Sequence, residues 1–272
     1  MSLNKQEGTD YSNLLPQVLQ LCKEVGEFQL KHLLKVSVVE IEEKTANQLV
    51  SFVDRNSEQM LVDGLKKLLP DSTIIGEESA SENRILTTET WIIDPLDGTT
   101  NFLHGLPVFS ISVALFVNGQ PELAVVECPS LKESFTAARG KGAHLNGASI
   151  QVAENVQLKN TLIATGFPYY TFGKMSEYLQ LLEVFMRSTQ GLRRMGSAAI
   201  DLAYVACGRF DAFFEMNLSP WDIAAGILLV REAGGRVTDF HGQEDIVFDQ
   251  EIIASSLAIY DTFTKEVALK LG

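Results

Sequence analysis

The segment WIIDPLDGTTNF, residues 91–102, carries the pattern on which the interpretation of this chain depends. Its apolar first part predicts a buried strand, so that Asp94 and Asp97 leave a rigid element and point into a cleft. Pro95 restricts the backbone, and Gly98 lets the chain turn and approach a ligand closely. The Thr-Thr-Asn stretch that follows is placed to begin a helix, whose free N–H groups can bind an anion. Two carboxylates three residues apart before such a helix indicate metal-bridged phosphate binding.

Two other segments carry acids in similar places. The stretch IIGEES places Glu77 and Glu78 after an apolar strand, and SPWDIAAG places Asp222 in the first turn of a predicted helix. Any one of these acids, taken alone, is more often a turn former, a helix-dipole residue or a solvated group. Three such segments in one chain, each beside an apolar element and with little basic charge nearby, favour a shared site. Carboxylates crowded together in such a site repel and raise each other's pKa. A cluster that stays ionised at neutral pH therefore requires cations.

The composition is that of a folded protein that does not bind nucleic acid directly. The 272 residues are 46% hydrophobic and 21% charged, with a net charge of −13. A nucleic-acid binder normally has a clustered basic surface, and the densest basic patch here is the pair Arg193-Arg194. An acidic protein that handles an anion needs a local source of positive charge, and bound metal cations supply one.

Other function classes lack their sequence signals. The three cysteines have no paired spacing, which argues against a disulfide framework and fits a reducing cytoplasm. We see no signal peptide and no apolar run long enough for a membrane span, so no membrane partner is expected. The four histidines lack zinc-ligand spacing, and neither a G-x-S-x-G elbow nor a P-loop occurs.

The hydrophobic periodicity predicts two halves in one compact unit, residues 1–150 and 151–272. Helices are expected over 11–35 and 45–69, followed by an antiparallel sheet whose Asn118-Gly119 pair predicts a hairpin turn. The second half alternates strands and helices, which indicates a mixed α/β arrangement. Its expected elements are strands near 161–165, 210–215, 236–239 and 252–255, and helices near 174–188, 197–207, 221–234 and from 260 onward. We expect a site between the halves.

Four segments taken together resemble the inositol monophosphatase family over nearly the whole chain. They are GEES (76–79), WIIDPLDGTTNF (91–102), GSAAIDLAYVACGRFDAFFE (196–215) and PWDIAAGILLVREAGG (220–235). The resemblance implies a layered αβαβα sandwich, a homodimer, activation by two to three Mg²⁺ ions per site and inhibition by Li⁺.

The resemblance also implies roles for individual residues. Metal ligands would be Glu77, Asp94, the Leu96 carbonyl, Asp97 and Asp222. Asp54 and Thr99 would orient the attacking water, and Glu77 would be the third catalytic residue. Substrate contacts would come from Asp97, Gly98, Thr99, Ala198, Glu215 and Asp222. A mobile lysine found in the family matches Lys44 only with a one-residue gap.

The expected reaction is hydrolysis of an inositol monophosphate by metal-activated water, since no residue is a convincing nucleophile. The same chemistry on fructose 1,6-bisphosphate, histidinol phosphate or adenosine 3′,5′-bisphosphate remains open. The TTNF ending, residues 99–102, favours an inositol-phosphatase-like member. A different class is a non-catalytic partner protein on the same fold, which the complete set of acids disfavours.

Overall fold

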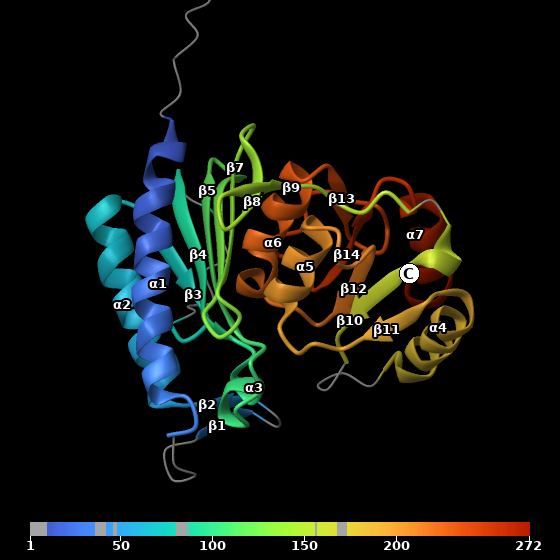
Figure 1. Ribbon diagram of the computed structural model, residues 1–272, viewed down its shortest axis with the longest axis horizontal. Coiled ribbons are helices and arrows are strands. Elements are labelled where there is room, and N and C mark those ends of the chain that lie inside the picture. The colour runs from blue at the N-terminus through green and yellow to red at the C-terminus, as the bar shows by residue number, and fades with distance from the viewer. Residues whose placement is uncertain are drawn as a thin grey trace, which may run out of the picture.

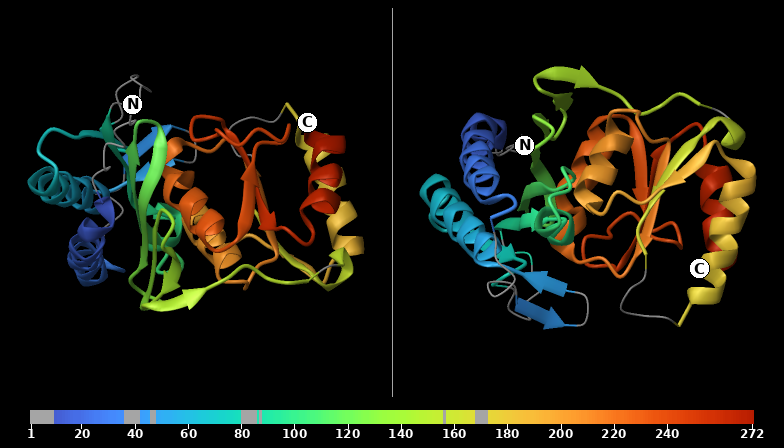
Figure 2. Two further views of the ribbon diagram at one scale, coloured as in Figure 1. Left: turned by 90° about the horizontal axis from the view of Figure 1, so that it is seen from above. Right: turned by 60° about the horizontal axis from the view of Figure 1, so that its bottom comes forward.

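A computed structural model of the chain describes residues 10–35, 42–45, 48–79, 86, 88–155, 157–167 and 173–272. Within them, helices and sheets alternate in five layers (Figure 1), and two further views show the same arrangement (Figure 2). The layered αβαβα sandwich expected from the resemblance is thus confirmed. The helices of the helical layers are α1 (Leu15–His32), α2 (Phe52–Leu68), α4 (Met175–Ser188), α5 (Ala198–Ala206), α6 (Pro220–Glu232) and α7 (Tyr260–Leu271).

The first sheet has seven strands in sequence order, and β3 and β4 are its only parallel pair. Its strands are β3 (Thr73–Gly76), β4 (Glu89–Asp97), β5 (Ser110–Val117), β6 (Gln120–Cys128), β7 (Glu133–Ala138), β8 (Gly142–Leu145) and β9 (Ala148–Ile150). The predicted hairpin between β5 and β6 is confirmed, with φ of 50° at Asn118 and 79° at Gly119. Asn and Gly tolerate these left-handed angles, which explains why this pair forms the turn.

The second sheet has five strands in the order β11-β10-β12-β14-β13. Its strands are β10 (Leu162–Thr165), β11 (Gly191–Arg193), β12 (Ala212–Met216), β13 (Gly235–Thr238) and β14 (Glu251–Ser256). Strand β10 is parallel to both β11 and β12, whereas β14 is antiparallel to β12 and β13. The alternation of strands and helices predicted for the second half is present, and its sheet has both parallel and antiparallel neighbours.

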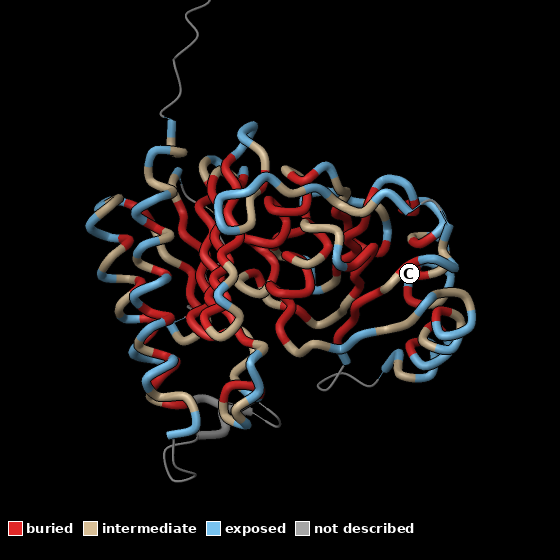
Figure 3. The backbone as a smooth tube through the Cα atoms, in the orientation of Figure 1, coloured by how far each residue is buried: buried red, intermediate tan, exposed pale blue. Residues whose placement is uncertain are grey.

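Three apolar cores hold the layers together. Figure 3 shows that buried residues are concentrated in the two sheets and in the helices between them. Helices α1 and α2 cover the outer face of the first sheet around Trp91, and α4 and α7 cover the second around Phe263. Helices α5 and α6 fill the space between the sheets, where eight of the nine α5 residues are buried. A helix that is apolar on nearly all sides is stable only when it is enclosed, which places α5 and α6 in the middle layer.

The structure corrects two predicted boundaries. The helix predicted over 45–69 begins only at Phe52, because Ser51 and Asp54 form a capping box, and strands β1 (Glu42–Thr45) and β2 (Gln48–Val50) precede it. Strand β4 continues to Asp97, so Asp94 and Asp97 lie within its last four residues and not after the strand. The pairing of β4 with β5 shifts register between these two residues. The side chain of Lys44 lies outside the described part of the structure.

Candidate metal and phosphate site

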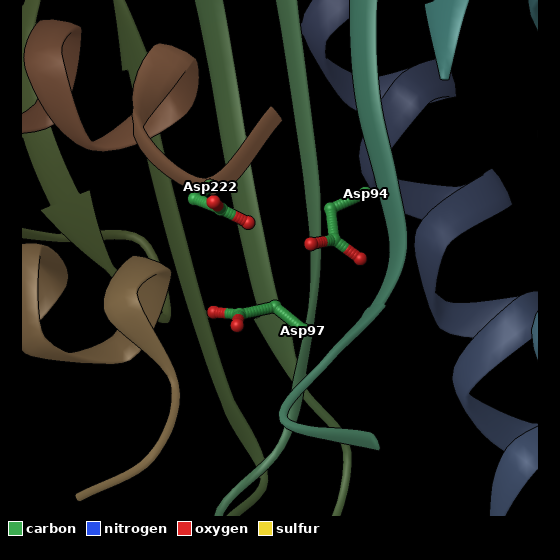
Figure 4. Close-up of side chains that lie close together, drawn as sticks. All are labelled: Asp94, Asp97 and Asp222. Atoms are coloured by element: carbon green, nitrogen blue, oxygen red, sulfur yellow. The ribbon is translucent and has the colours of Figure 1, made fainter. Parts of the chain in front are cut away.

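Three carboxylates from two distant parts of the chain meet at one point (Figure 4). Asp94 and Asp97 come from the end of β4, and Asp222 comes from the first turn of α6. Each contributes an oxygen that lies within 4.8 Å of the oxygens of the other two. The structure thus brings together three of the acids that the sequence analysis singled out, and Asp222 lies at least 125 positions from the other two along the chain.

The electrostatics of this cluster are unfavourable without cations. Burial and the charges of Glu77, Asp97 and Asp222 raise the pKa of Asp94 well above its usual value. Burial and the charge of Asp97 do the same to the pKa of Asp222. Burial raises the pKa of Asp97 to about 6, although hydrogen bonds from Ser197 Oγ and a backbone N–H of α5 act in the opposite direction. Oxygen ligands gathered at this density fit a hard divalent cation.

Asp222 and Asp54 are both held by helix capping. Asp222 accepts a 2.6 Å hydrogen bond from the Ser219 N–H, and Asp54 accepts bonds of 2.8 and 2.7 Å from the N–H and Oγ of Ser51. Each acid stands at the third position of its helix, where a capping box fixes the side chain. The same two carboxylates therefore cap a helix and belong to the candidate site. For this reason the sequence alone is also compatible with a purely structural role for each of them.

Asp54 reaches the site through Thr99. Thr99 Oγ1 lies 2.9 Å from Asp54 Oδ1 and 3.0 Å from the Leu96 carbonyl oxygen, and its hydroxyl hydrogen can point to either acceptor. The second Asp54 oxygen is engaged by Ser51, so the first is left for Thr99. Asp54 and Thr99, which the resemblance pairs, therefore lie within hydrogen-bond distance of each other.

A sharp turn at Gly98 begins the short helix α3 (Thr99–Leu103) beside these acids. Gly98 has φ of +94°, and a Cβ there would lie 3.0 Å from the Val108 carbonyl oxygen and 3.1 Å from that of Gly196. Only glycine adopts this conformation at such close packing without strain. The first N–H groups of a helix have no partner within the helix, so the turn places such donors next to the carboxylates.

A pocket of about 220 Å³ opens from the acids toward the second sheet. Among the residues that line it are all of the predicted site residues except Asp54, namely Glu77, Asp94, Leu96, Asp97, Gly98, Thr99, Ala198, Glu215 and Asp222. Glu215 lies on β12, and burial raises its pKa to about 8 while the charge of Arg194 opposes the shift. The pocket thus joins the carboxylate cluster to a wall built by α5 and β12.

Several lining residues were missed by the sequence interpretation. Asp201 lies in the first turn of α5 and is only 1% exposed; burial and the charges of Glu215 and Asp97 raise its pKa. Arg194 lies near enough to lower the pKa of Asp97, Glu215 and Asp201. The signal for Asp201 was present, since it is the one charged residue in the apolar stretch Ala198–Ala206.

Side chains from the outer helices hold the acid-bearing segments. Gln29 on α1 is fully buried and donates a 2.6 Å hydrogen bond from Nε2 to the Pro95 carbonyl oxygen, between Asp94 and Leu96. Glu58 on α2 accepts a 2.8 Å hydrogen bond from the Glu78 N–H, next to Glu77. These contacts fix the backbone from which the site residues project.

Comparisons with known proteins agree with this geometry. A model of the inositol monophosphatase family matches residues 10–270. A putative Nus factor SuhB of Neisseria meningitidis is 44% identical over 242 residues, covering 89% of this chain and 93% of that protein; the Nus factor SuhB of Escherichia coli is 41% identical over 243 residues, covering 89% and 91%.

Solved structures give the same result. A Thermotoga maritima IMPase is 39% identical with a TM-score of 0.84, covering 93% of this chain and 96% of that one. The extragenic suppressor protein suhB of Bartonella henselae is 39% identical with a TM-score of 0.87, covering 93% and 97%. Sequence and fold lead to one conclusion: the chain belongs to the inositol monophosphatase family.

Proposed function

We propose that this protein is a Mg²⁺-dependent phosphatase that hydrolyses a phosphate monoester of a small polyhydroxy alcohol, with inositol monophosphate as the preferred substrate. The observation that carries the proposal is the convergence of Asp94, Asp97 and Asp222 within 4.8 Å, next to the turn at Gly98. Ligands for cations and donors for a phosphate group then stand side by side, as phosphate-ester hydrolysis requires.

The donor set suits magnesium. Glu77, Asp94, Asp97, Asp222 and the Leu96 carbonyl would hold two to three Mg²⁺ ions, and all of them line the same pocket. The raised pKa values of Asp94 and Asp222 reflect repulsion that bound cations would relieve. Magnesium ions, when bound, supply positive charge that lowers the pKa of water and stabilises the leaving oxygen.

The chain's own residues orient the reactants. The N–H groups of Gly98 and Thr99 would bind the phosphate oxygens, as expected from the resemblance. Thr99 Oγ1 donates to Asp54, which leaves its lone pairs free to accept a hydrogen bond from the attacking water. Asp54 can receive the proton that Thr99 relays, so the pair acts as a general base. Ala198 and Glu215, with Asp97 and Asp222, would contact the hydroxyl groups of the alcohol.

The substrate class follows from the acids on the alcohol side of the pocket. A carboxylate such as that of Glu215 accepts hydrogen bonds from hydroxyl groups, which an inositol ring offers in every direction. Fructose 1,6-bisphosphate, histidinol phosphate and adenosine 3′,5′-bisphosphate are the competing substrates.

The proposal is tested by phosphate release from a panel of these four substrates, with Mg²⁺, with a chelator, and with Mg²⁺ plus Li⁺. We expect Mg²⁺-dependent release, highest kcat/KM for inositol monophosphate, and inhibition by Li⁺. Asp97→Asn and Asp222→Asn should lose most of this activity. Either variant retaining full Mg²⁺-dependent activity would contradict the assignment of these acids as metal ligands.

The names of the relatives favour a second candidate. Proteins called Nus factor SuhB are 41–44% identical to this chain, so we propose as an alternative that it acts as a partner in a protein assembly of that kind. The net charge of −13 argues against direct contact with RNA in such a role. Activity loss in Asp97→Asn without loss of the assembly role would separate the two functions.

We further propose that the protein works in the cytoplasm as a homodimer, as the family resemblance implies. None of the helices in the described residues is long and apolar enough to cross a membrane. Sedimentation equilibrium of the full chain tests the oligomeric state, for which we expect twice the 30.0 kDa mass of one chain.

A further inference from the structure

Two residues that line the pocket each carry a buried polar atom with no hydrogen-bond partner among the described residues. These atoms are Asp201 Oδ1, an acceptor, and Asn217 Nδ2, a donor. Nearly all buried polar groups in folded proteins are hydrogen-bonded, because leaving one without a partner destabilises the fold. A pair of such atoms in one pocket therefore indicates a ligand that supplies the missing partners.

Asp201 does not cap its helix, although the charge of Arg194 lies near it. The N-cap of α5 is Ser197, whose Oγ accepts a hydrogen bond from the Ile200 N–H, so the helix start is already satisfied. Asp201 is 1% exposed, and the rest of α5 is apolar. Replacing a carboxyl at this position with an apolar side chain would remove a desolvation cost. Its presence is explained if the carboxyl meets a ligand in the pocket.

Asn217 shows a matching feature on the opposite element. It follows directly after β12, the strand that carries Glu215, and its φ is +65°. Asparagine adopts this left-handed conformation more readily than most other non-glycine residues, as Asn118 also does in its turn. The conformation places the Asn217 side chain in the pocket wall, where its amide nitrogen is buried and without a partner.

An unsatisfied acceptor and an unsatisfied donor in the same wall are complementary to hydroxyl groups, which donate one hydrogen bond and accept others. We propose that Asp201 and Asn217 are specificity-determining residues that bind hydroxyl groups of the alcohol portion of the substrate. This inference rests on the proposed function and extends it, because it assigns the preference for a polyhydroxy alcohol to two residues outside the set that the family resemblance supplied.

The test compares an ester rich in hydroxyl groups with one that has none on its alcohol portion: myo-inositol 1-phosphate and p-nitrophenyl phosphate. The variants are Asp201→Ala and Asn217→Gly. Alanine is the best helix former and suits α5, and glycine adopts the left-handed conformation of Asn217 without strain. Asp261→Ala is the matched control, since Asp261 lies exposed in the first turn of α7.

We expect kcat/KM for myo-inositol 1-phosphate to fall about tenfold in each variant, the effect of losing one hydrogen bond to the substrate. The value for p-nitrophenyl phosphate should change less than about twofold, and the control should match wild type with both esters. The Tm of Asp201→Ala should equal or exceed that of wild type, because an unpaired buried oxygen is removed.

Equal losses with both esters, or a lower Tm in Asp201→Ala, would show that these residues serve the fold or the phosphate site, and would overturn the inference alone. Unchanged kcat/KM with both esters would also overturn it. A wild-type protein that hydrolyses neither ester in the presence of Mg²⁺ overturns the proposed function and this inference with it.

Discussion

Thr99 Oγ1 and Asp54 Oδ1 lie 2.9 Å apart, although 45 positions separate the two residues in the chain. The contact joins α2 in the outer helical layer to the turn after β4, where the acidic cluster stands. Asp54 is 1% exposed and is also fixed by Ser51, so the orientation of Thr99 is set by the fold before any ligand binds. Preorganised groups of this kind are what catalysis requires, since they cost no reorganisation during the reaction.

Removal of the Thr99 hydroxyl should therefore slow the reaction while leaving metal binding intact. Thr99→Val keeps the shape of the side chain and removes the group that links the water to Asp54. We expect kcat to fall by about 10²–10⁴-fold, the usual contribution of general base catalysis. Isothermal titration with Mg²⁺ should give an affinity close to wild type. Thr262→Val, the same change at an exposed position of α7 outside the pocket, is the control and should retain nearly full kcat.

The turn at Gly98 should tolerate no side chain. Gly98→Ala combines a φ of +94° with contacts of 3.0 and 3.1 Å to two carbonyl oxygens. Gly140→Ala is a matched control, because Gly140 has φ of +68° and open space around it. We expect the control to lose about 1 kcal/mol of unfolding free energy from the left-handed conformation alone. Gly98→Ala should lose more unfolding free energy than the control, as measured by urea unfolding, and should also lose activity. Equal losses of unfolding free energy in the two variants would show that the close packing at Gly98 does not contribute to stability.

Gln29 should affect metal affinity from a distance, because its Nε2 holds the Pro95 carbonyl oxygen at 2.6 Å. Gln29→Leu keeps the volume of the side chain but frees the backbone between Asp94 and Leu96. We expect Mg²⁺ affinity to fall about tenfold or more, as is usual for residues that support metal ligands. Gln20→Leu, the same change on the exposed face of α1, should leave the affinity unchanged. Equal Mg²⁺ affinities in wild type and Gln29→Leu would show that Gln29 does not support the metal ligands.

The acidic cluster should also make stability depend on pH when no metal is bound. Burial raises the pKa of Asp97 to about 6 and that of Glu215 to about 8. A carboxyl whose pKa is higher in the folded than in the unfolded state takes up protons on folding, so it destabilises the fold at high pH. In the presence of a chelator, unfolding free energy should therefore rise as the pH falls from about 8 toward about 4, the unfolded carboxyl pKa.

Urea unfolding at several pH values measures this dependence, and Glu215→Gln is the informative variant. It should be more stable than wild type above pH 8 in chelator and should show a shallower slope. Saturating Mg²⁺ should stabilise wild type most at high pH, where the carboxylates are ionised. A stability that increases with pH between 6 and 8 in chelator would contradict the raised pKa values.

The sequence predicted the acids of the site because strand ends and helix starts are visible as local patterns. Asp94, Asp97 and Asp222 each follow or begin a clearly periodic element, and the structure brings them together. Their convergence depends on layer packing between β4 and α6, which no local pattern specifies. The resemblance to a known family supplied that part, including the role of Asp54 at the start of a helix whose first turn was predicted seven residues too early.

Other features were beyond local reasoning for identifiable reasons. Leu49 and Val50 of β2 extend the apolar pattern of α2 toward the N-terminus, and only the Ser51–Asp54 capping box marks where the helix begins. The sequence analysis gave Asp201 no role, because a single acid in an apolar helix shows no spacing that connects it to the other acids. Its importance became visible only when the pocket and its unpaired oxygen were known.

The proposed metal site is tested most directly by a crystal structure with Mn²⁺ in place of Mg²⁺, in which anomalous scattering locates the ions. We expect at least two ions bound by oxygens of Asp94, Asp97 and Asp222, about 3.5–4 Å apart as in other two-metal sites. Anomalous peaks elsewhere, or a site between these three carboxylates that stays empty at saturating Mn²⁺, would contradict it.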